Sequence, residues 1–442
     1  MTASRSAPVA VALWLALASP LLGAQSPSHP VADSAGAARA AWTRMNAARR
    51  AGDLPAALAQ AQRAATAWPT QPAYHWGRAL LAARMGDTAA ALAGLRAYAA
   101  LGLGRDLAGD SAIAALRGAP AFEAVRAIHD RNRRPLARGT VLRQTADSTL
   151  WPEGVDHDPR TGDFYLASVR RRTVVRVAPD GSTRELWPGG APGLGAMLGV
   201  RVDPARRRIW ATTSGLKQSE GYAPADTGIA ALLRIDAATG RIERRWDLPV
   251  VPGGHVLGDV ALGPDGEVYV SDSNEPVLYR LRPGADTLDR FRHPLFRSLQ
   301  GLAATADGRF VYVADYSHGL LRLRVSDGSV ARLGDAPGST SLGCDGIVLH
   351  RGSIVAVQNG VAPARIVRFA LAAAGDSIVA AQLLDQQPAL APEPTIGTMV
   401  GDRFVYVANS QWEVHDDEGR RRPGATLGGA RLIAVPLGDG TR

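Results

Sequence analysis

Four polar residues stand at the start of short apolar stretches in the C-terminal two thirds of the chain. Glu153 lies in PEGV, Asp259 in LGDV, Gln300 in LQGL and Asp345 in CDGI. Carboxylate and amide oxygens gathered in a water-filled pocket suit a hard divalent cation such as Ca²⁺. Without a cation or protons to neutralise them, such carboxylates would repel each other and their pKa values would rise. The four residues therefore predict a metal site, or a wet polar channel without a metal, if the fold brings them together.

The strands around these residues belong to a repeat that begins near Thr140. In each unit a turn precedes an apolar strand and a second alternating stretch follows it. The six strands are DFYLAS at Asp163, RRIWATT at Arg207, GEVYVSD at Gly266, RFVYVAD at Arg309, GSIVAVQN at Gly352 and RFVYVAN at Arg403. A spacing of about 40–60 residues is typical of four-stranded propeller blades. The pattern predicts a mainly β fold, a six-bladed β-propeller over residues 138–440, with a β-sandwich as the structural alternative.

A propeller would bring the four polar residues together. The innermost strand of each blade points one end at the central channel, so the residues at the strand starts converge there. The strand GTVLRQT at Gly139 is predicted to pair with the C-terminal stretch RLIAVPL, which would close the ring and hide its edges. Two long insertions, over residues 214–228 and 411–424, fall in corresponding places of the second and sixth units. They are predicted to shape a binding site on one face.

The stretch from Glu153 to Pro436 resembles the senescence-marker-protein (SMP)/gluconolactonase/LRE-like family of six-bladed propellers. The resemblance is carried by EGVDHDPRTGDFYLAS at Glu153, QGLAATADGRFVYVADY at Gln300 and DGIVLHRGSIVAV at Asp345. It implies one metal in the channel, most often Ca²⁺ or Zn²⁺, held by Glu153, Gln300 and Asp345. Gln300 stands where the family has Asn, which keeps the carbonyl ligand and adds a methylene. Gly258 stands where the family has a further Asn that helps to bind substrate.

The resemblance also implies an activity, the metal-dependent hydrolysis of a small lactone or ester. The metal would polarise the substrate carbonyl, and Asp345 or Asp259 would act as general base on the attacking water. The alternative is an exported protein that binds a ligand or another protein without catalysis, because the fold alone does not decide between the two. A histidine-assisted hydrolase would favour His318 in ADYSHG, although a single loop histidine is more often structural.

Residues 33–130 follow a different period and predict an α-helical segment before the propeller. The dipeptides Gly52-Asp53 and Gly86-Asp87 lie 34 residues apart, which is the period of a tetratricopeptide helix pair. Each Gly is predicted to end one helix and each Asp to cap the next. The segment resembles a tetratricopeptide array of about two units, and because so few units are marginally stable alone we expect them to pack on the propeller. A protein partner could bind its concave face.

The N-terminus predicts export. Arg5, the apolar run VAVALWLALASPLL and the small residues GA form the pattern of a signal peptide over residues 1–24. The mature protein would be periplasmic or secreted and have no membrane span, and a retained anchor helix is the alternative. The net charge of +9 comes almost entirely from scattered arginines near turns, which argues against a nucleic-acid partner. Cys344 is the only cysteine, so no intramolecular disulfide can form.

Overall fold

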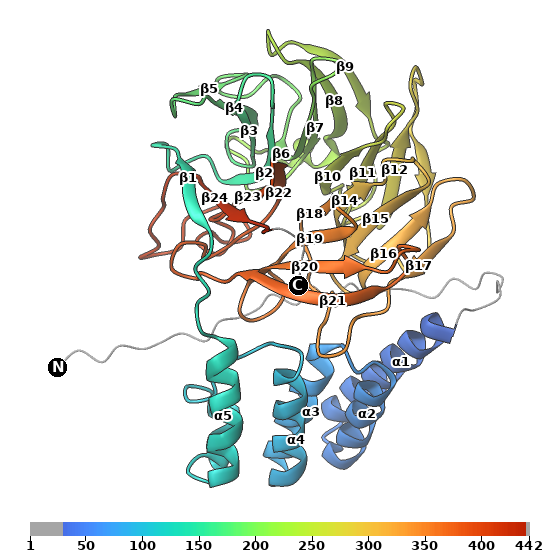
Figure 1. Ribbon diagram of the computed structural model, residues 1–442, viewed down its shortest axis with the longest axis vertical. Helices are drawn as coiled ribbons and strands as arrows, with labels where there is room; N and C mark the ends of the chain where they lie inside the picture. The colour runs from blue at the N-terminus through green and yellow to red at the C-terminus, as the bar shows by residue number, and fades with distance from the viewer. Residues whose placement is uncertain (1–29, 439–442) are drawn as a thin grey trace.

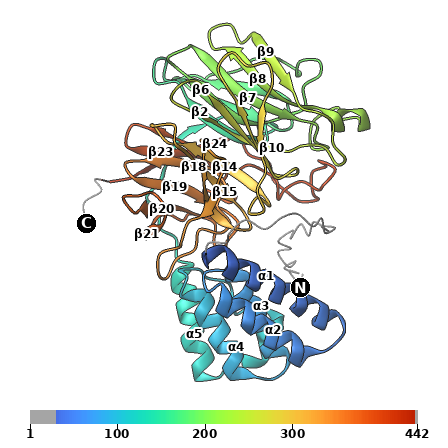
Figure 2. The ribbon, with the colours of Figure 1, turned by 90° about the vertical axis from the view of Figure 1, so that its right-hand side faces the viewer.

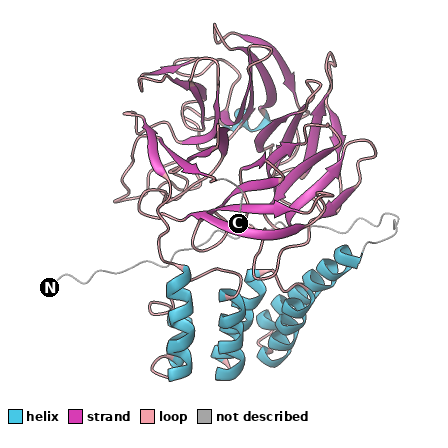
Figure 3. Ribbon diagram, in the orientation of Figure 1, coloured by secondary structure: helices cyan, strands magenta, loops and turns pink. Residues whose placement is uncertain are grey.

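The chain folds into a layer of helices followed by a β-propeller. The computed structural model describes residues 30–438, and the signal peptide predicted at residues 1–24 lies outside this range. Figure 3 shows the long helices gathered on one side and the strands, with one short helical turn among them, on the other. Among the described helices, none is both long enough and apolar enough to cross a membrane.

The helical layer contains two helix pairs, a short 3-10 helix and a last helix that leads into the propeller. They are α1 (Pro30–Arg50), α2 (Leu54–Ala67), α3 (Pro72–Arg84), α4 (Thr88–Ala99), η1 (Ser111–Leu116) and α5 (Pro120–Asn132). Oδ1 of Asp53 accepts a 2.9 Å hydrogen bond from the amide of Ala56, and Oδ1 of Asp87 accepts one of 2.9 Å from that of Ala90. These bonds confirm the predicted capping, because they satisfy amides that have no partner within the helix.

The propeller has six antiparallel sheets of four strands each, as predicted (Figure 1). The strands of the first three blades, from the channel outward, are β2 (Pro152–His157), β3 (Phe164–Ser168), β4 (Thr173–Val177) and β5 (Thr183–Glu185); β6 (Ala196–Asp203), β7 (Arg208–Ser214), β8 (Ala230–Asp236) and β9 (Ile242–Asp247); and β10 (Leu257–Leu262), β11 (Val268–Asp272), β12 (Val277–Leu281) and β13 (Asp289–Phe291). A short 3-10 helix, η2 (Pro224–Gly228), lies in the long loop between β7 and β8.

The last three blades follow the same order, and the sixth is closed by the first strand of the chain. Their strands are β14 (Leu299–Ala304), β15 (Phe310–Asp315), β16 (Gly319–Arg324) and β17 (Val330–Arg332); β18 (Ile347–His350), β19 (Ser353–Gln358), β20 (Arg365–Leu371) and β21 (Ile378–Asp385); and β22 (Gly397–Val400), β23 (Arg403–Val407), β24 (Arg431–Pro436) and β1 (Thr140–Gln144). β1 pairs with β24, with Thr140 opposite Ala434, which confirms the predicted closure.

The core lies between neighbouring blades. The second strands β3, β11 and β19 are buried along their whole length, because each blade packs against a neighbour on both faces. The outermost strands β5 and β13 are instead partly exposed. This explains why the second strands are apolar at nearly every position, which is typical of strands covered on both sides.

The antiparallel order places several loops on one face of the propeller. The first strand of each blade begins where the second strand ends, so the loops that follow the second strands lie around the channel opening at the start of the first strands. We call this the mouth face. The long loops 215–229 and 408–430 both lie on it, and the helical layer packs against its rim at blades 4 and 5, below β20 and β21 in Figure 2.

Candidate functional site

Six structurally equivalent positions surround the channel at the mouth face. In blades 1 to 4 the register of the first two strands shifts once, at Pro152/Val155, Met197/Val200, Leu257/Val260 and Leu299/Leu302. Blades 5 and 6 have backbone hydrogen bonds in place of this shift. When the six blades are aligned on these features, one side chain of each blade occupies the same position at the channel. The six are Glu153, Leu198, Gly258, Gln300, Asp345 and Thr395. One side of the ring is therefore polar, and the side formed by blades 2 and 3 is apolar.

Glycines at the next position let the blades approach closely around the channel. A Cβ atom on Gly154 would lie 2.2 Å from the carbonyl oxygen of Leu198, and one on Gly301 would lie 2.4 Å from that of Asp345. Because these distances are far below van der Waals contact, a side chain does not fit there. The close approach fixes the backbone that carries the ring side chains.

Glu153 and Asp345 meet at the hydroxyl of Thr395. The Thr395 Oγ1 atom lies 3.0 Å from Oε1 of Glu153 and 3.2 Å from Oδ2 of Asp345. A hydroxyl carries one proton, so it can donate to only one of two ionised carboxylates at a time. The geometry therefore fits either one proton shared by the pair or a cation that neutralises both.

Two further side chains hold the carboxylates from the loops of the mouth face. Nδ2 of Asn359 donates a 2.7 Å hydrogen bond to Oδ2 of Asp345, and the Tyr316 hydroxyl lies 2.5 Å from Oδ1 of Asn359. Nε1 of Trp412, in the loop 408–430, donates a 2.7 Å hydrogen bond to Oε2 of Glu153. Glu153 is thus oriented by donors from blade 6, and Asp345 by Asn359 of its own blade 5 together with Thr395.

Burial raises the pKa values of both carboxylates, and the charge of a nearby acid, Asp345 for Glu153 and Asp259 for Asp345, adds to each shift. Burial comes first and the charge of Asp345 second in raising the pKa of Glu153 to about 8, against hydrogen bonds from Trp412 and Thr395 that lower it. Burial also raises the pKa of Asp345 to about 6, while hydrogen bonds from Asn359 and Thr395 oppose the shift. Two interacting acids with separated pKa values are a common feature of sites that bind cations or move protons.

The other two residues singled out in the sequence have different surroundings. Nε2 of Gln300 donates to Ser298 Oγ at 3.2 Å, and its Oε1 lies 3.9 Å from where a Cβ of Gly258 would stand, beside blade 3. Asp259 lies one residue further into its strand than the ring position and is fully buried. Its Oδ2 pairs with Nη2 of Arg201 at 3.2 Å and accepts from the amide of Leu302 at 3.0 Å.

The structure thus joins Glu153 and Asp345, and it places Gln300 on blade 4, next to Asp345, and Asp259 on blade 3. Within residues 30–438, no three His, Cys, Asp or Glu side chains are grouped in a way that could hold a metal. A cation at this site would therefore take its remaining oxygens from neutral groups such as the Thr395 hydroxyl or the Gln300 amide.

The loop 408–430 covers part of the mouth and is held in a strained form. Gln411 in this loop and Trp151, which precedes β2 and packs against the loop, are non-glycine residues with φ angles of 78° and 46°, respectively. The Trp151 ring stacks on His415 at 4.0 Å between centroids and meets Trp412 edge-on at 5.1 Å. Such backbone conformations cost of order 1–3 kcal/mol each and concentrate at functional sites.

Glu393 and a surface ion pair anchor the same loop. Oε1 of Glu393 accepts a 3.0 Å hydrogen bond from the amide of Glu413, and burial followed by the charge of Glu413 raises the pKa of Glu393 to about 7. Lys217, in the loop 215–229, pairs with Glu418 at 2.7 Å. The two insertions recognised in the sequence therefore meet above blades 1, 2 and 6.

Sequence reasoning missed Thr395, Trp412 and the part played by Tyr316. Thr395 could have been found, because it precedes Ile396 as Glu153 precedes Gly154. Trp412 gave no signal, because it lies in an insertion without any repeat to align it. Tyr316 follows the end of β15, where the sequence shows only a strand terminus.

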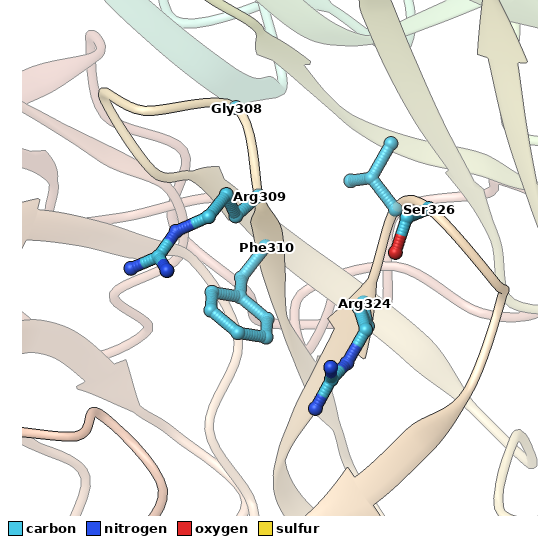
Figure 4. A pocket seen from close by; sticks show the side chains of 6 residues that line it. Gly308, Arg309, Phe310, Arg324 and Ser326 are labelled. Carbon is cyan, nitrogen blue, oxygen red and sulfur yellow. The ribbon is translucent and has the colours of Figure 1, made fainter.

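A separate cavity of about 350 Å³ lies at the opposite end of blade 4. Figure 4 shows the side chains of Arg309, Phe310 and Arg324 around it. Arg309 precedes β15, Phe310 begins that strand and Arg324 ends β16, so all three lie toward the face away from the mouth. This cavity is not part of the channel site.

Neither a protein-family model nor a curated protein sequence matches this chain. Among the solved structures similar to it is a gluconolactonase from Xanthomonas campestris, with 16% identity and a TM-score of 0.44 over 70% of this chain and 93% of that one. The calcium-binding protein regucalcin from Agrobacterium tumefaciens has 17% identity and a TM-score of 0.44 over 67% and 94%. A PQQ-bound aldose sugar dehydrogenase from Streptomyces coelicolor has 17% identity and a TM-score of 0.45 over 69% and 99%.

These structures include the group that the sequence motifs resemble. At this level of similarity the comparison concerns the fold alone, and proteins with different activities share it. A function for this chain is therefore inferred from the side chains at the mouth of its channel.

Proposed function

We propose that this chain is an exported hydrolase that opens a small lactone or ester at the mouth of the propeller channel. A divalent cation, Ca²⁺ in the first place and Zn²⁺ in the second, would be held by Glu153 and Asp345, with Gln300 as the third ligand. The observation that carries the proposal is the pair of buried carboxylates at one hydroxyl, Thr395. Without a cation or a proton, this arrangement leaves two negative charges in a poorly solvated place.

The donor chemistry fits a hard cation. Within the described residues nothing donates to Oδ1 of Asp345, and each oxygen of Glu153 accepts one bond and keeps a second lone pair. Ca²⁺ takes six to eight oxygen ligands from carboxylates, carbonyls and water, so a site with two carboxylates, an amide and open positions meets its needs. When bound, the cation would polarise the substrate carbonyl as a Lewis acid.

Asp345 is the residue best placed to move a proton. Hydrogen bonds from Asn359 and Thr395 favour its ionised form and orient Oδ2, while no donor among the described residues bonds Oδ1. As water attacks the carbonyl carbon, Asp345 would take the proton. It would return that proton to the leaving oxygen when the ester bond breaks. The apolar side of the ring, at Leu198 and Gly258, would take the part of the substrate that does not react.

The experiment that tests this proposal is calorimetric titration of the full mature chain with Ca²⁺ and with Zn²⁺, followed by a screen of lactones and esters. Asp345→Ala should abolish stoichiometric binding and turnover. Asp307→Ala is the matched control, because Asp307 is an exposed carboxylate paired with Arg309 in a turn on the opposite face. Absence of binding at millimolar metal in the unmodified chain would contradict the proposed cation.

Binding without catalysis is the second candidate, and a feature of the helical layer favours it. A cavity of about 480 Å³ lies between α1 and α3, lined among others by Trp42, Met45, Leu80 and Arg84. A groove with apolar walls and an arginine suits a peptide or small ligand that carries an acidic group. If no lactone or ester is hydrolysed, and a ligand that binds the unmodified chain no longer binds Trp42→Ala, binding without catalysis replaces hydrolysis as the proposed function.

A further inference from the structure

Three residues of the channel site come from loops that also contact the helical layer. Tyr316 follows β15, Asn359 follows β19, and Asp345 precedes β18, all in blades 4 and 5. Each lies within three residues of a side chain that packs against a helix: His318, Val361 and Leu342. We infer that the helical layer positions this half of the channel site, in addition to any part it plays in binding a partner.

The first contact is made by His318, two residues after Tyr316. His318 is fully buried, and its ring stacks on Trp68 of the helical layer with 5.9 Å between centroids. Its Nε2 lies 2.5 Å from Nη1 of Arg39 in α1. The backbone carbonyl of His318 also accepts a 2.8 Å bond from Arg332, whose guanidinium lies over the Trp68 ring. The loop that carries Tyr316 is thus held from the helical side.

The second contact is made by Leu342, three residues before Asp345. Leu342 is 3% exposed and packs in a cluster whose other members come from the helical layer, including Ala38, Trp68 and Tyr74. In the same loop, Oδ2 of Asp335 accepts a 2.6 Å hydrogen bond from the hydroxyl of Thr70. The loop 333–346 therefore cannot keep this conformation if the helices move away.

The third contact follows Asn359. Val361 packs against Tyr98, Leu101 and Leu103, and the carbonyl of Ala362 accepts a 3.0 Å bond from the amide of Gly104.

A chain of hydrogen bonds connects the end of β19 and the loop 333–346 to the helical layer. Nη1 of Arg365 donates to the carbonyl of Gly102 at 2.8 Å, and Nε of Arg365 donates to Oε1 of Gln358 at 2.7 Å. Nε2 of Gln358 then donates to the carbonyls of Thr340 and Leu342, each at 2.8 Å.

The other half of the site is held differently. Glu153 and Thr395 lie in blades 1 and 6, and Trp412 reaches Glu153 from the loop 408–430, which is tied to the loop 215–229 by Lys217 and Glu418. None of the described contacts of these residues is with the helical layer. Loss of the helical contacts would therefore shift Asp345 relative to Glu153, across the shared hydroxyl of Thr395.

This inference rests on the proposed function in one respect, because the site that it concerns is the proposed one. Leu342, Val361 and His318 are accordingly positioning residues that act through Asp345, Asn359 and Tyr316. Their effect is structural first, so it can be measured without substrate or metal.

The test is hydrogen exchange of backbone amides in the full chain, comparing Leu342→Ala with the parent. The amide of Asp345 donates to Val357 at 2.8 Å and that of Gly360 to Gly343 at 3.0 Å, so both report on the positioned loops. Removing the Leu342 side chain leaves a cavity under these loops, and we expect both amides to exchange about tenfold faster or more. The amide of Val169, which donates to Trp151 in blade 1, should be unaffected.

Matched variants separate positioning from general loss of stability. Leu323→Ala removes the same side chain from the fully buried core of blade 4, away from the helices, and should leave the Asp345 and Gly360 amides unchanged. Leu342→Met should restore slow exchange, because it keeps the buried volume. If Leu342→Ala does not fold, Arg39→Ala at the half-buried end of the same interface replaces it.

Two results would overturn the inference. One is faster exchange limited to α1 and the loop 335–342, with the Asp345 and Gly360 amides unchanged. The other is an equal increase in the blade 1 amides, which would mean that the whole propeller is destabilised.

Calcium affinity is the second measurement that tests the inference. If the parent chain binds Ca²⁺, Leu342→Ala should bind it about tenfold more weakly while Leu323→Ala binds it as before, since metal sites depend on ligand placement. Unchanged affinity in Leu342→Ala would count against positioning. If the parent chain binds no Ca²⁺, the proposed cation fails while the exchange experiment still decides whether the helices position the loops.

Discussion

The indole nitrogen of Trp412 lies 2.7 Å from Oε2 of Glu153, across a separation of 259 residues in sequence. This bond ties the loop 408–430 of blade 6 to a channel carboxylate of blade 1. It is one of two side-chain bonds that favour the ionised form of Glu153, and the other comes from Thr395. The loop thus affects the protonation of Glu153 and also covers part of the site.

Trp412→Phe should weaken cation binding in a pH-dependent way. Phe keeps an aromatic ring against Trp151 but removes the N–H donor, so the pKa of Glu153 should rise further. At pH 7 we expect Ca²⁺ affinity to fall about three- to tenfold, the equivalent of one typical hydrogen bond. At pH 9.5 the difference should shrink, because Glu153 is then mostly ionised in both proteins. Calorimetry at the two pH values measures this.

The control for that experiment is Trp246→Phe. Nε1 of Trp246 also donates one hydrogen bond, to the carbonyl of Ala285 at 3.2 Å, in a part of blade 2 that lies away from the mouth. The control should lose stability without losing Ca²⁺ affinity. A Trp412→Phe variant with unchanged affinity at pH 7 would contradict a role for this bond.

Glu153→Gln should make the metal-free protein more stable at high pH. Folding raises the pKa of Glu153 from an ordinary value of 4.5 to about 8, so between these values the folded state holds a proton that the unfolded state has lost. The free energy of unfolding therefore falls as pH rises through this window. Gln removes that loss, and we expect the variant to be about 2 kcal/mol more stable at pH 8.5 and nearly equal to the parent at pH 4.

Urea unfolding in the presence of a chelator, at pH 4, 6 and 8.5, measures the effect. Saturating Ca²⁺ should reverse the order, because only the parent would bind it and gain stability from binding. A variant that is less stable than the parent at pH 8.5 without metal would show that the charge of Glu153 does not destabilise the folded state.

Thr395→Val should affect both carboxylates at once. Val keeps the shape of Thr and removes the hydroxyl that contacts Glu153 and Asp345. We expect a loss of about 1–2 kcal/mol in stability and about tenfold in Ca²⁺ affinity, because the remaining carboxylates are less well oriented. Thr398→Val on the same blade removes a hydroxyl that bonds Asp156 at 2.5 Å, away from the site. If both variants lose Ca²⁺ affinity equally, the shared hydroxyl has no special part.

The fold could be predicted from the sequence because its signals are local. Each blade repeats a turn, an alternating strand and a second strand, and the helical segment repeats a Gly-Asp pair, so neighbouring residues alone indicate the elements. The pairing of β1 with β24, which closes the ring, could be predicted because the repeat has a strand at each end that needs a partner. The expected packing of the helices on the propeller is confirmed by contacts such as that of Leu342 with Trp68 and Tyr74.

The site could be predicted only in part, because it depends on where side chains point in three dimensions. Glu153 and Asp345 were found because both stand before a glycine at a strand start. No sequence pattern indicates that Asp259 occupies the glycine position itself, where its side chain turns toward Arg201. Trp412 reaches Glu153 from an insertion whose path is set by tertiary contacts.

Asp259→Asn distinguishes the two general bases predicted from the sequence. Asp259 is buried and paired with Arg201 at 3.2 Å, and both of its oxygens accept backbone amides, from Val260 and Leu302. Removing its charge leaves Arg201 unpaired, and we expect a loss of about 3 kcal/mol in stability. Turnover per folded molecule should change little if Asp345 is the base. A drop of more than about a hundredfold in kcat with unchanged stability would instead assign the base to Asp259.

Gly301→Ala should disturb the site through the backbone alone. Its amide donates to the carbonyl of Asp345 at 3.2 Å, and a Cβ would lie 2.4 Å from that same oxygen, so blades 4 and 5 must separate to admit it. We expect a loss of about 2–4 kcal/mol in stability and weaker Ca²⁺ binding, as for other overpacked positions.

Gly334→Ala is the control for this last variant, because a Cβ there meets nothing within 4 Å and it should leave stability and binding unchanged. Denaturant unfolding and calorimetry on both variants separate the two effects. If Gly301→Ala loses stability but binds Ca²⁺ with the parent affinity, the separation of the blades does not reach the Asp345 carboxylate. The site would then tolerate a shift of the backbone that carries it.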